Sequence, residues 1–161
     1  MIRALVLLAT LLPAGAHALS CSPPNAAGHV HHELDDPHLL VLHGTLKPRG
    51  ALPKRIDYET IWAKADFTGF ELSALGKKPV RYPIQIAASC IASWCADLPT
   101  STISGLFVLG TYETAPAPVL DLNACGFGVY PEPDQSQTDI LLRCLREGGC
   151  AYADIEAFDP Y

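Results

Sequence analysis

Six cysteines that all follow a short apolar N-terminus constrain this chain of 161 residues more than any other feature. Arg3 precedes an apolar run over residues 5–12 that is too short to span a bilayer, and an A-x-A cleavage site ends at Ala18. We therefore predict a signal peptide over residues 1–18, export to the periplasm or the extracellular space, and a mature chain over residues 19–161. Thiols that leave the reducing cytosol pair in an oxidising compartment, so an even number of cysteines predicts a disulfide-stapled fold.

The mature chain has the size and composition of a single domain. Apolar residues make up 49% of the sequence and charged residues 17%, which suffices for a packed interior. Cleavage would remove one of the 11 basic residues and none of the 17 acidic ones, which leaves a formal charge of −7. This charge disfavours nucleic acids and anionic membranes as partners. No apolar run after the cleavage site is long enough for a transmembrane helix. We expect the mature protein to be a monomer that binds a protein or a small ligand.

Apolar segments with a period of two predict a mainly β fold. Five segments have the pattern of strands: residues 39–46, 60–70, 80–88, 106–112 and 119–125. Gly69 is expected to bend or end the second strand, and Pro83 is expected to keep the third at a sheet edge or a bulge. Residues 22–37 lack a sustained period, so they are predicted to form a loop with at most a short turn of helix.

One helix is predicted, near the C-terminus. Asp134 and Gln137 have the spacing of a capping box, the apolar residues that follow lie on one side, and Gly148 with Gly149 ends the helix. Several strands with wide loops and one late helix are typical of a small barrel or sandwich, because a doubly wound sheet needs a helix between successive strands.

The order of several short motifs resembles that of the netrin-like module, the partly open OB barrel of tissue inhibitors of metalloproteinases and related secreted proteins. The motifs are Leu19-Ser20-Cys21-Ser22-Pro23, Leu40-Val41-Leu42-His43-Gly44-Thr45-Leu46, Phe67-Thr68-Gly69, Cys90, Gly105 to Tyr112, and Leu122-Asn123-Ala124-Cys125-Gly126 followed by a helix and Gly149-Cys150. The resemblance covers most of the mature chain and implies a five-stranded OB-like barrel with one C-terminal helix.

The resemblance departs from that family at the first mature residue. In the inhibitors this residue is a cysteine whose amine and carbonyl chelate the zinc of the target enzyme, whereas Leu19 stands here. The preorganised chelator is missing, so the resemblance implies the fold rather than that inhibitory activity.

The resemblance also implies one arrangement of the cysteines among the 15 that six cysteines allow. By analogy, the pairs are Cys21 with Cys125, Cys90 with Cys95, and Cys144 with Cys150. The alternative joins Cys125 to Cys144 and Cys21 to Cys150. Residues 18–21 loosely resemble a bacterial lipobox, which would acylate Cys21 and leave five cysteines, so an envelope lipoprotein is a further alternative.

Residues 28–38 contain the densest set of potential metal ligands, led by His29, His31 and His32. Imidazole suits zinc and copper, and a segment of this kind can wrap several nitrogens around one ion. Neither H-E-x-x-H nor H-x-H-x-D-H fits the spacing, so a solvated histidine-rich loop is the competing interpretation.

The sequence contains no recognisable catalytic motif. It lacks G-x-S-x-G, G-x-G-x-x-G and a P-loop, and four residues separate Cys90 from Cys95 instead of the two found in thiol oxidoreductases. The leading hypothesis is an exported, non-enzymatic binding or inhibitor-like domain without a cofactor. A periplasmic protein that holds zinc or copper on the histidines is the alternative from another functional class.

Overall fold

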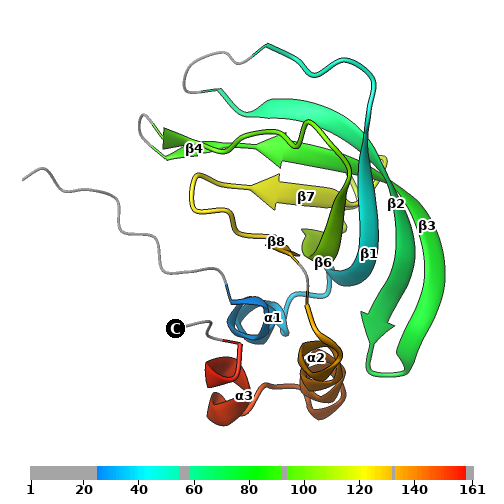
Figure 1. Cartoon of the computed structure of the whole chain (residues 1–161), viewed down its shortest axis with the longest axis vertical. Coiled ribbons are helices and arrows are strands. Elements are labelled where there is room, and N and C mark those ends of the chain that lie inside the picture. The colour runs from blue at the N-terminus through cyan, green and yellow to red at the C-terminus, as the bar shows by residue number, and fades with distance from the viewer. Residues whose placement is uncertain (1–24, 55–58, 92–93, 132, 159–161) are drawn as a thin grey trace, which may run out of the picture.

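A six-stranded β-sheet with helices at one end makes up the computed structural model, which describes residues 25–54, 59–91, 94–131 and 133–158 (Figure 1). The elements are α1 (Ala26–Glu33), β1 (Leu39–Arg49), β2 (Ile61–Ser73), β3 (Gly76–Ala88), β4 (Cys90–Ile91), β5 (Trp94–Cys95), β6 (Ile103–Gly110), β7 (Val119–Leu122), β8 (Val129–Pro131), α2 (Gln135–Glu147) and α3 (Tyr152–Glu156). The mainly β class predicted from the sequence is confirmed. The predicted signal peptide, Leu19 and Cys21 lie outside the described residues.

The sheet has the strand order β1-β2-β3-β7-β6-β8, and β1 also pairs with β6. β1, β2 and β3 form an antiparallel meander, and β3 pairs with β7 in parallel. β6 joins β7 through one register pair, Gly110 with Val119, so the pairings of five strands return to β1. All five segments predicted to be strands overlap these five strands. The sheet has a sixth strand because β7 leaves part of β6 free, where β8 pairs with it.

Three glycines in neighbouring strands allow the sheet to bend. Gly44 of β1 pairs with Gly69 of β2 on one side and with Gly105 of β6 on the other. A Cβ at Gly44 would lie 2.4 Å from a backbone oxygen of β2, so only glycine fits there. Beyond Gly69, β2 continues to Ser73 and buries Leu72, which belongs to the alternate set that is exposed earlier in the strand. Gly69 therefore changes the buried face of the strand without ending it.

Prolines lie where a strand has a single neighbour. Pro83 belongs to the part of β3 that pairs with β2 alone, because the pairing with β7 begins at Gln85. Pro48 lies in the extension of β1 beyond Leu46, the last residue that pairs with β6. Since proline donates no ladder hydrogen bond, both sites are positions that tolerate it. The edge position predicted for Pro83 is confirmed.

Buried apolar side chains form two clusters. The first, here called the strand core, is built mainly from strands and contains Leu42, Leu46, Ile61, Ala63, Ala65, Phe67, Ile84, Ile86, Ala88, Ala96, Leu98, Phe107, Leu109, Leu120 and Leu122. The second, here called the helix layer, lies between the sheet and the helices and contains Ala26, Ala27, Val30, Val41, Leu72, Leu106, Val108, Tyr130, Leu141, Leu142, Cys144, Cys150 and Phe158.

The prediction of a loop over residues 22–37 is wrong in its central part, which forms the two-turn helix α1. The side chain of Asn25 accepts a hydrogen bond from the Gly28 amide at 3.0 Å and so caps the helix. Its amide group also donates to the Ile155 carbonyl at 2.7 Å, which ties the start of α1 to α3. α1 buries mostly small residues, so its sequence lacks the apolar stripe that normally identifies a helix.

The helix predicted near the C-terminus is confirmed, including its two ends. Asp134 and Gln137 form the reciprocal capping box of α2, and Gly148 ends the helix in the left-handed conformation. The expectation of one helix is wrong, because α1 and α3 are also present. Among the described residues, no helix has the length and apolar character needed to cross a membrane.

Two of the expected cysteine pairs are within disulfide distance. Cys90 and Cys95 face each other across β4 and β5, and Cys144 pairs with Cys150 in the helix layer. The alternative pairing of Cys125 with Cys144 is therefore wrong. Cys125 is disulfide-bonded, and the partner that the resemblance implies for it, Cys21, lies outside the described residues.

Candidate functional site

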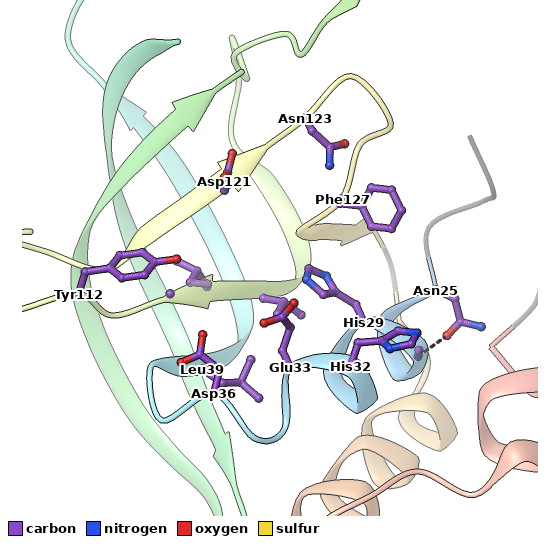
Figure 2. A pocket seen from close by; sticks show the side chains of 14 residues that line it. Asn25, His29, His32, Glu33, Asp36, Leu39, Tyr112, Asp121, Asn123 and Phe127 are labelled. Carbon is purple, nitrogen blue, oxygen red and sulfur yellow. Dashed lines mark hydrogen bonds between the residues drawn. The ribbon is translucent and has the colours of Figure 1, made fainter. Parts of the chain in front are cut away.

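A pocket of about 540 Å³ lies between α1, the end of β6 and the segment that follows β7. Figure 2 shows side chains of α1 on one side of this space and side chains of β7 and its following loop on the other side. The residues that line it are Asn25, Gly28, His29, His32, Glu33, Asp36, Leu39, Val108, Leu109, Gly110, Tyr112, Asp121, Asn123 and Phe127. The helix that the sequence did not predict thus forms one wall of the pocket.

His29 is a half-buried titratable side chain of this pocket. Its Nδ1 lies 2.6 Å from the hydroxyl of Tyr130, and the edge of its ring packs against Phe127 with the ring centres 6.0 Å apart. Burial lowers the pKa of His29, and nearby His32 lowers it further, whereas Glu33 acts in the opposite direction. His29 is therefore neutral at physiological pH.

Tyr130 holds the ring of His29 through one hydrogen bond between its hydroxyl and Nδ1. Burial raises the pKa of Tyr130 to about 12, so its hydroxyl keeps its proton. Either group can be the donor of this bond, depending on the tautomer of the imidazole. His29 thus contributes a neutral imidazole instead of a cation.

Carboxylates dominate the polar lining of the pocket. Glu33 ends α1, Asp36 follows it, and Asp121 points outward from β7 on the other side (Figure 2). Asp36 is fixed by the amide of His38, which donates to its Oδ1 at 2.8 Å. Among the described residues that line the pocket there is no lysine or arginine. The potential in this space is therefore negative, which favours a cationic or hydrogen-bond-donating ligand.

A second pocket of about 460 Å³ adjoins the first and shares Tyr112 and Asp121 with it. Its floor is a row of residues paired across three strands, in which Ala87 of β3 pairs with Trp62 of β2 and with Asp121 of β7. Trp62 is 54% exposed and Tyr112 is 49% exposed. Gly110 makes room for Tyr112, since a Cβ at Gly110 would lie 2.5 Å from the tyrosine hydroxyl. The two pockets together are called the Asp121 groove below.

The structure divides the three histidines predicted to bind metal between two surroundings. His29 and His32 line the first pocket, whereas Nδ1 of His31 accepts a hydrogen bond from the Cys150 amide at 3.2 Å. In the part of the chain that the structure describes, no group of three or more His, Cys, Asp or Glu side chains is arranged to hold a metal ion. His31 instead connects α1 to the segment after α2.

Sequence patterns do not mark the other members of the site. Asp121, Phe127 and Tyr130 carry no local motif, and Tyr112 belongs only to a predicted strand. These residues come together because β6 pairs with both β7 and β8. Trp62 gave a partial signal, since the alternation in β2 already places it on the polar face. Comparisons with protein-family models, with curated proteins and with solved structures found no match for this chain.

Proposed function

We propose that this chain is an exported, non-enzymatic binding domain that takes its ligand in the Asp121 groove. The observation that carries the proposal is the groove itself, which combines two adjoining cavities, exposed aromatic rings and polar groups that converge from separate elements. Concave sites with this mixed lining are the usual ligand sites of small domains. A binding role also accounts for the neutral His29, whose Nδ1 is occupied by Tyr130.

We further propose that the sheet is a partly open five-stranded barrel of the OB type, as the netrin-like resemblance implies. The return of the strand pairings to β1 supports this proposal, and the single register pair between β6 and β7 is consistent with a partly open barrel. In such barrels the loops at the barrel face are common recognition sites. Here the segment between β6 and β7 contributes Tyr112, Thr114 and Pro116 to the groove.

Export with cleavage after Ala18 is part of the proposal. The disulfide pairs and the bonded state of Cys125 support an oxidising compartment. Mass spectrometry of the native protein tests this point. A chain that begins at Leu19 with six oxidised cysteines supports export as a free protein. An acylated Cys21 would instead identify a lipoprotein, and six reduced thiols would refute export.

A fragment titration monitored by NMR tests the binding function. The mature protein is labelled with ¹⁵N and exposed to a library of small polar aromatic and amine compounds. Binding in the groove should shift the resonances of Gly28, Gly110 and the Trp62 indole, while those of Gly50 and Gly76, which line neither pocket, stay constant. If no compound of the library shifts the resonances of the groove, or if the shifts are confined to other surfaces, the proposal is refuted.

A further inference from the structure

The row Trp62, Ala87 and Asp121 places an aromatic ring and a carboxylate on either side of a methyl group. The three residues lie on neighbouring strands in register, so they share the outer face of the sheet. Neighbouring strands are about 4.8 Å apart, which separates the backbone positions of Trp62 and Asp121 by about 10 Å. Ala87 between them carries only a methyl group, is 5% exposed and lines the second pocket. A cationic head group there would contact the indole face and the carboxylate together.

The other half of the groove continues this pattern. Glu33 and Asp36 lie on the α1 side of the first pocket and Asp121 lies on the β7 side (Figure 2). Tyr112 lines both pockets. His29 adds no opposing charge, because it is neutral and its Nδ1 is held by Tyr130. An extended molecule with a positive group at each end could therefore place one group at each set of carboxylates.

We infer that the Asp121 groove binds alkylammonium groups, supplied by a free diamine or by a lysine side chain of a protein. The inference rests on the proposed binding function and specifies the ligand chemistry of that site. An anionic ligand fits the groove poorly, since three carboxylates line it and no lysine or arginine is among its described lining residues. An ammonium on an apolar chain matches both the charge and the aromatic surface.

Titration calorimetry of the mature protein with defined probes tests the inference. Butane-1,4-diamine and pentane-1,5-diamine represent the free ligand, N-acetyl-lysine-methylamide represents the protein side chain, and N-acetyl-norleucine-methylamide is the uncharged match. The charged probes should bind more tightly than the uncharged one, and the difference should shrink as salt is raised. Tighter binding of the diamines would identify the free ligand as the source, and tighter binding of the lysine amide would identify a protein partner.

Substitutions inside and outside the groove test where the charged probes bind. Asp121→Asn removes one charge with little change of shape and should weaken binding of the charged probes about three- to ten-fold. Asp139→Asn removes the same charge from the exposed face of α2, and binding should be unchanged. Trp62→Ala should weaken binding about three-fold. Equal effects of Asp121→Asn and Asp139→Asn would overturn the inference.

Failure of the inference can be told apart from failure of the proposed function. If uncharged fragments shift groove resonances while the charged probes bind no better than the norleucine amide, the groove remains a binding site and the alkylammonium assignment is wrong. If no compound of either kind shifts groove resonances, the binding function itself is refuted.

Discussion

The strand core and the helix layer bury similar kinds of side chains but are assembled differently. The strand core consists of alternate residues from long paired strands, so each side chain is positioned by a backbone ladder. The helix layer joins two short helices, one longer helix and a disulfide, which meet through single contacts such as the one from Asn25 to the Ile155 carbonyl. Regular pairing makes the first cluster robust, whereas the second depends on a few specific links.

The Asp121 groove lies where these two regions meet. Strands β2, β3 and β7, which carry Trp62, Ala87 and Asp121, supply one side of the groove, and α1 supplies the other. Changes in the strand core should therefore alter stability with little effect on groove geometry. Changes in the helix layer should alter the groove even where their cost in stability is smaller.

The largest effect is expected from Gly44→Ala, which tests the bend of the sheet. The new methyl group would lie 2.4 Å from a backbone oxygen and 2.7 Å from the Cα of Gly69, and neither can move without breaking the ladder. We expect a loss of more than about 4 kcal/mol in the free energy of unfolding, measured by urea denaturation. Gly50→Ala is the control, because Gly50 has open space around it and its positive φ alone should cost about 1 kcal/mol. Similar losses for both would show that the bend does not require glycine.

Truncation of one buried residue in each region compares them directly. Phe67→Ala removes a ring that packs edge-on against Phe107 in the strand core, with ring centres 5.9 Å apart, and should cost about 3–5 kcal/mol. Val30→Ala in α1 should cost about 2 kcal/mol. Native-state hydrogen exchange should nevertheless show faster local exchange of α1 amides only in the Val30 variant. Faster exchange of α1 in both variants would mean that the two regions open as one unit.

The two short disulfides extend the comparison, because their closed loops are almost equal in length. Each bridge should contribute about 2 kcal/mol through chain entropy. Cys144 and Cys150 are also buried in the helix layer, and the sulfur of Cys150 contacts the Ala27 carbonyl at 3.3 Å. We therefore expect the double variant Cys144→Ala, Cys150→Ala to lose about 1–2 kcal/mol more than the double variant Cys90→Ala, Cys95→Ala. Equal losses of stability in the two double variants, measured by thermal unfolding, would show that the Cys144–Cys150 bridge stabilises the helix layer only as a covalent constraint and not through packing.

The same contrast explains how much the sequence could predict. Alternation in β2 and the capping box of α2 are local signals, so both elements could be predicted with residues such as Phe67 and Asp134 in their correct roles. α1 escaped prediction because it buries Ala26 and Ala27, which are too small to make an apolar stripe, while its histidines suggested a polar loop.

The site was less predictable than the fold because its residues come from strands that become neighbours only in the folded sheet. Asp121 is one acidic residue in a short strand, and only the parallel pairing of β3 with β7 brings it beside Ala87 and Trp62. The cluster of histidines drew attention to the correct segment but to a different chemistry. One of its members, His31, faces the segment after α2, and His29 is held by Tyr130, a residue 101 positions away.

A smaller effect is expected at the start of α2, which closes the helix layer. Asp134→Ala removes the side-chain oxygen that accepts from the Gln137 amide at 2.8 Å, and should lower the urea midpoint of unfolding. Asp134→Asn keeps an accepting oxygen and should lower this midpoint less. Urea denaturation of both variants measures the difference, and equal stability of the two would show that the capping box contributes nothing.

The smallest effect is the pH dependence that His29 imposes on the helix layer. Burial holds the pKa of His29 below its value of 6.5 in an unfolded chain, so below pH 6.5 the unfolded chain binds a proton that the folded protein does not. Stability from this group is thus complete above about pH 6.5 and decreases as the pH falls toward the lowered pKa. His43, whose pKa is lowered by burial and by Lys77, acts in the same direction. The thermal midpoint should therefore fall on acidification from pH 7 to pH 5, and it should fall less in His29→Gln. Identical slopes for His29→Gln and the unchanged protein would mean that α1 leaves the sheet before the imidazole is charged, and the helix layer would then be the first region to open.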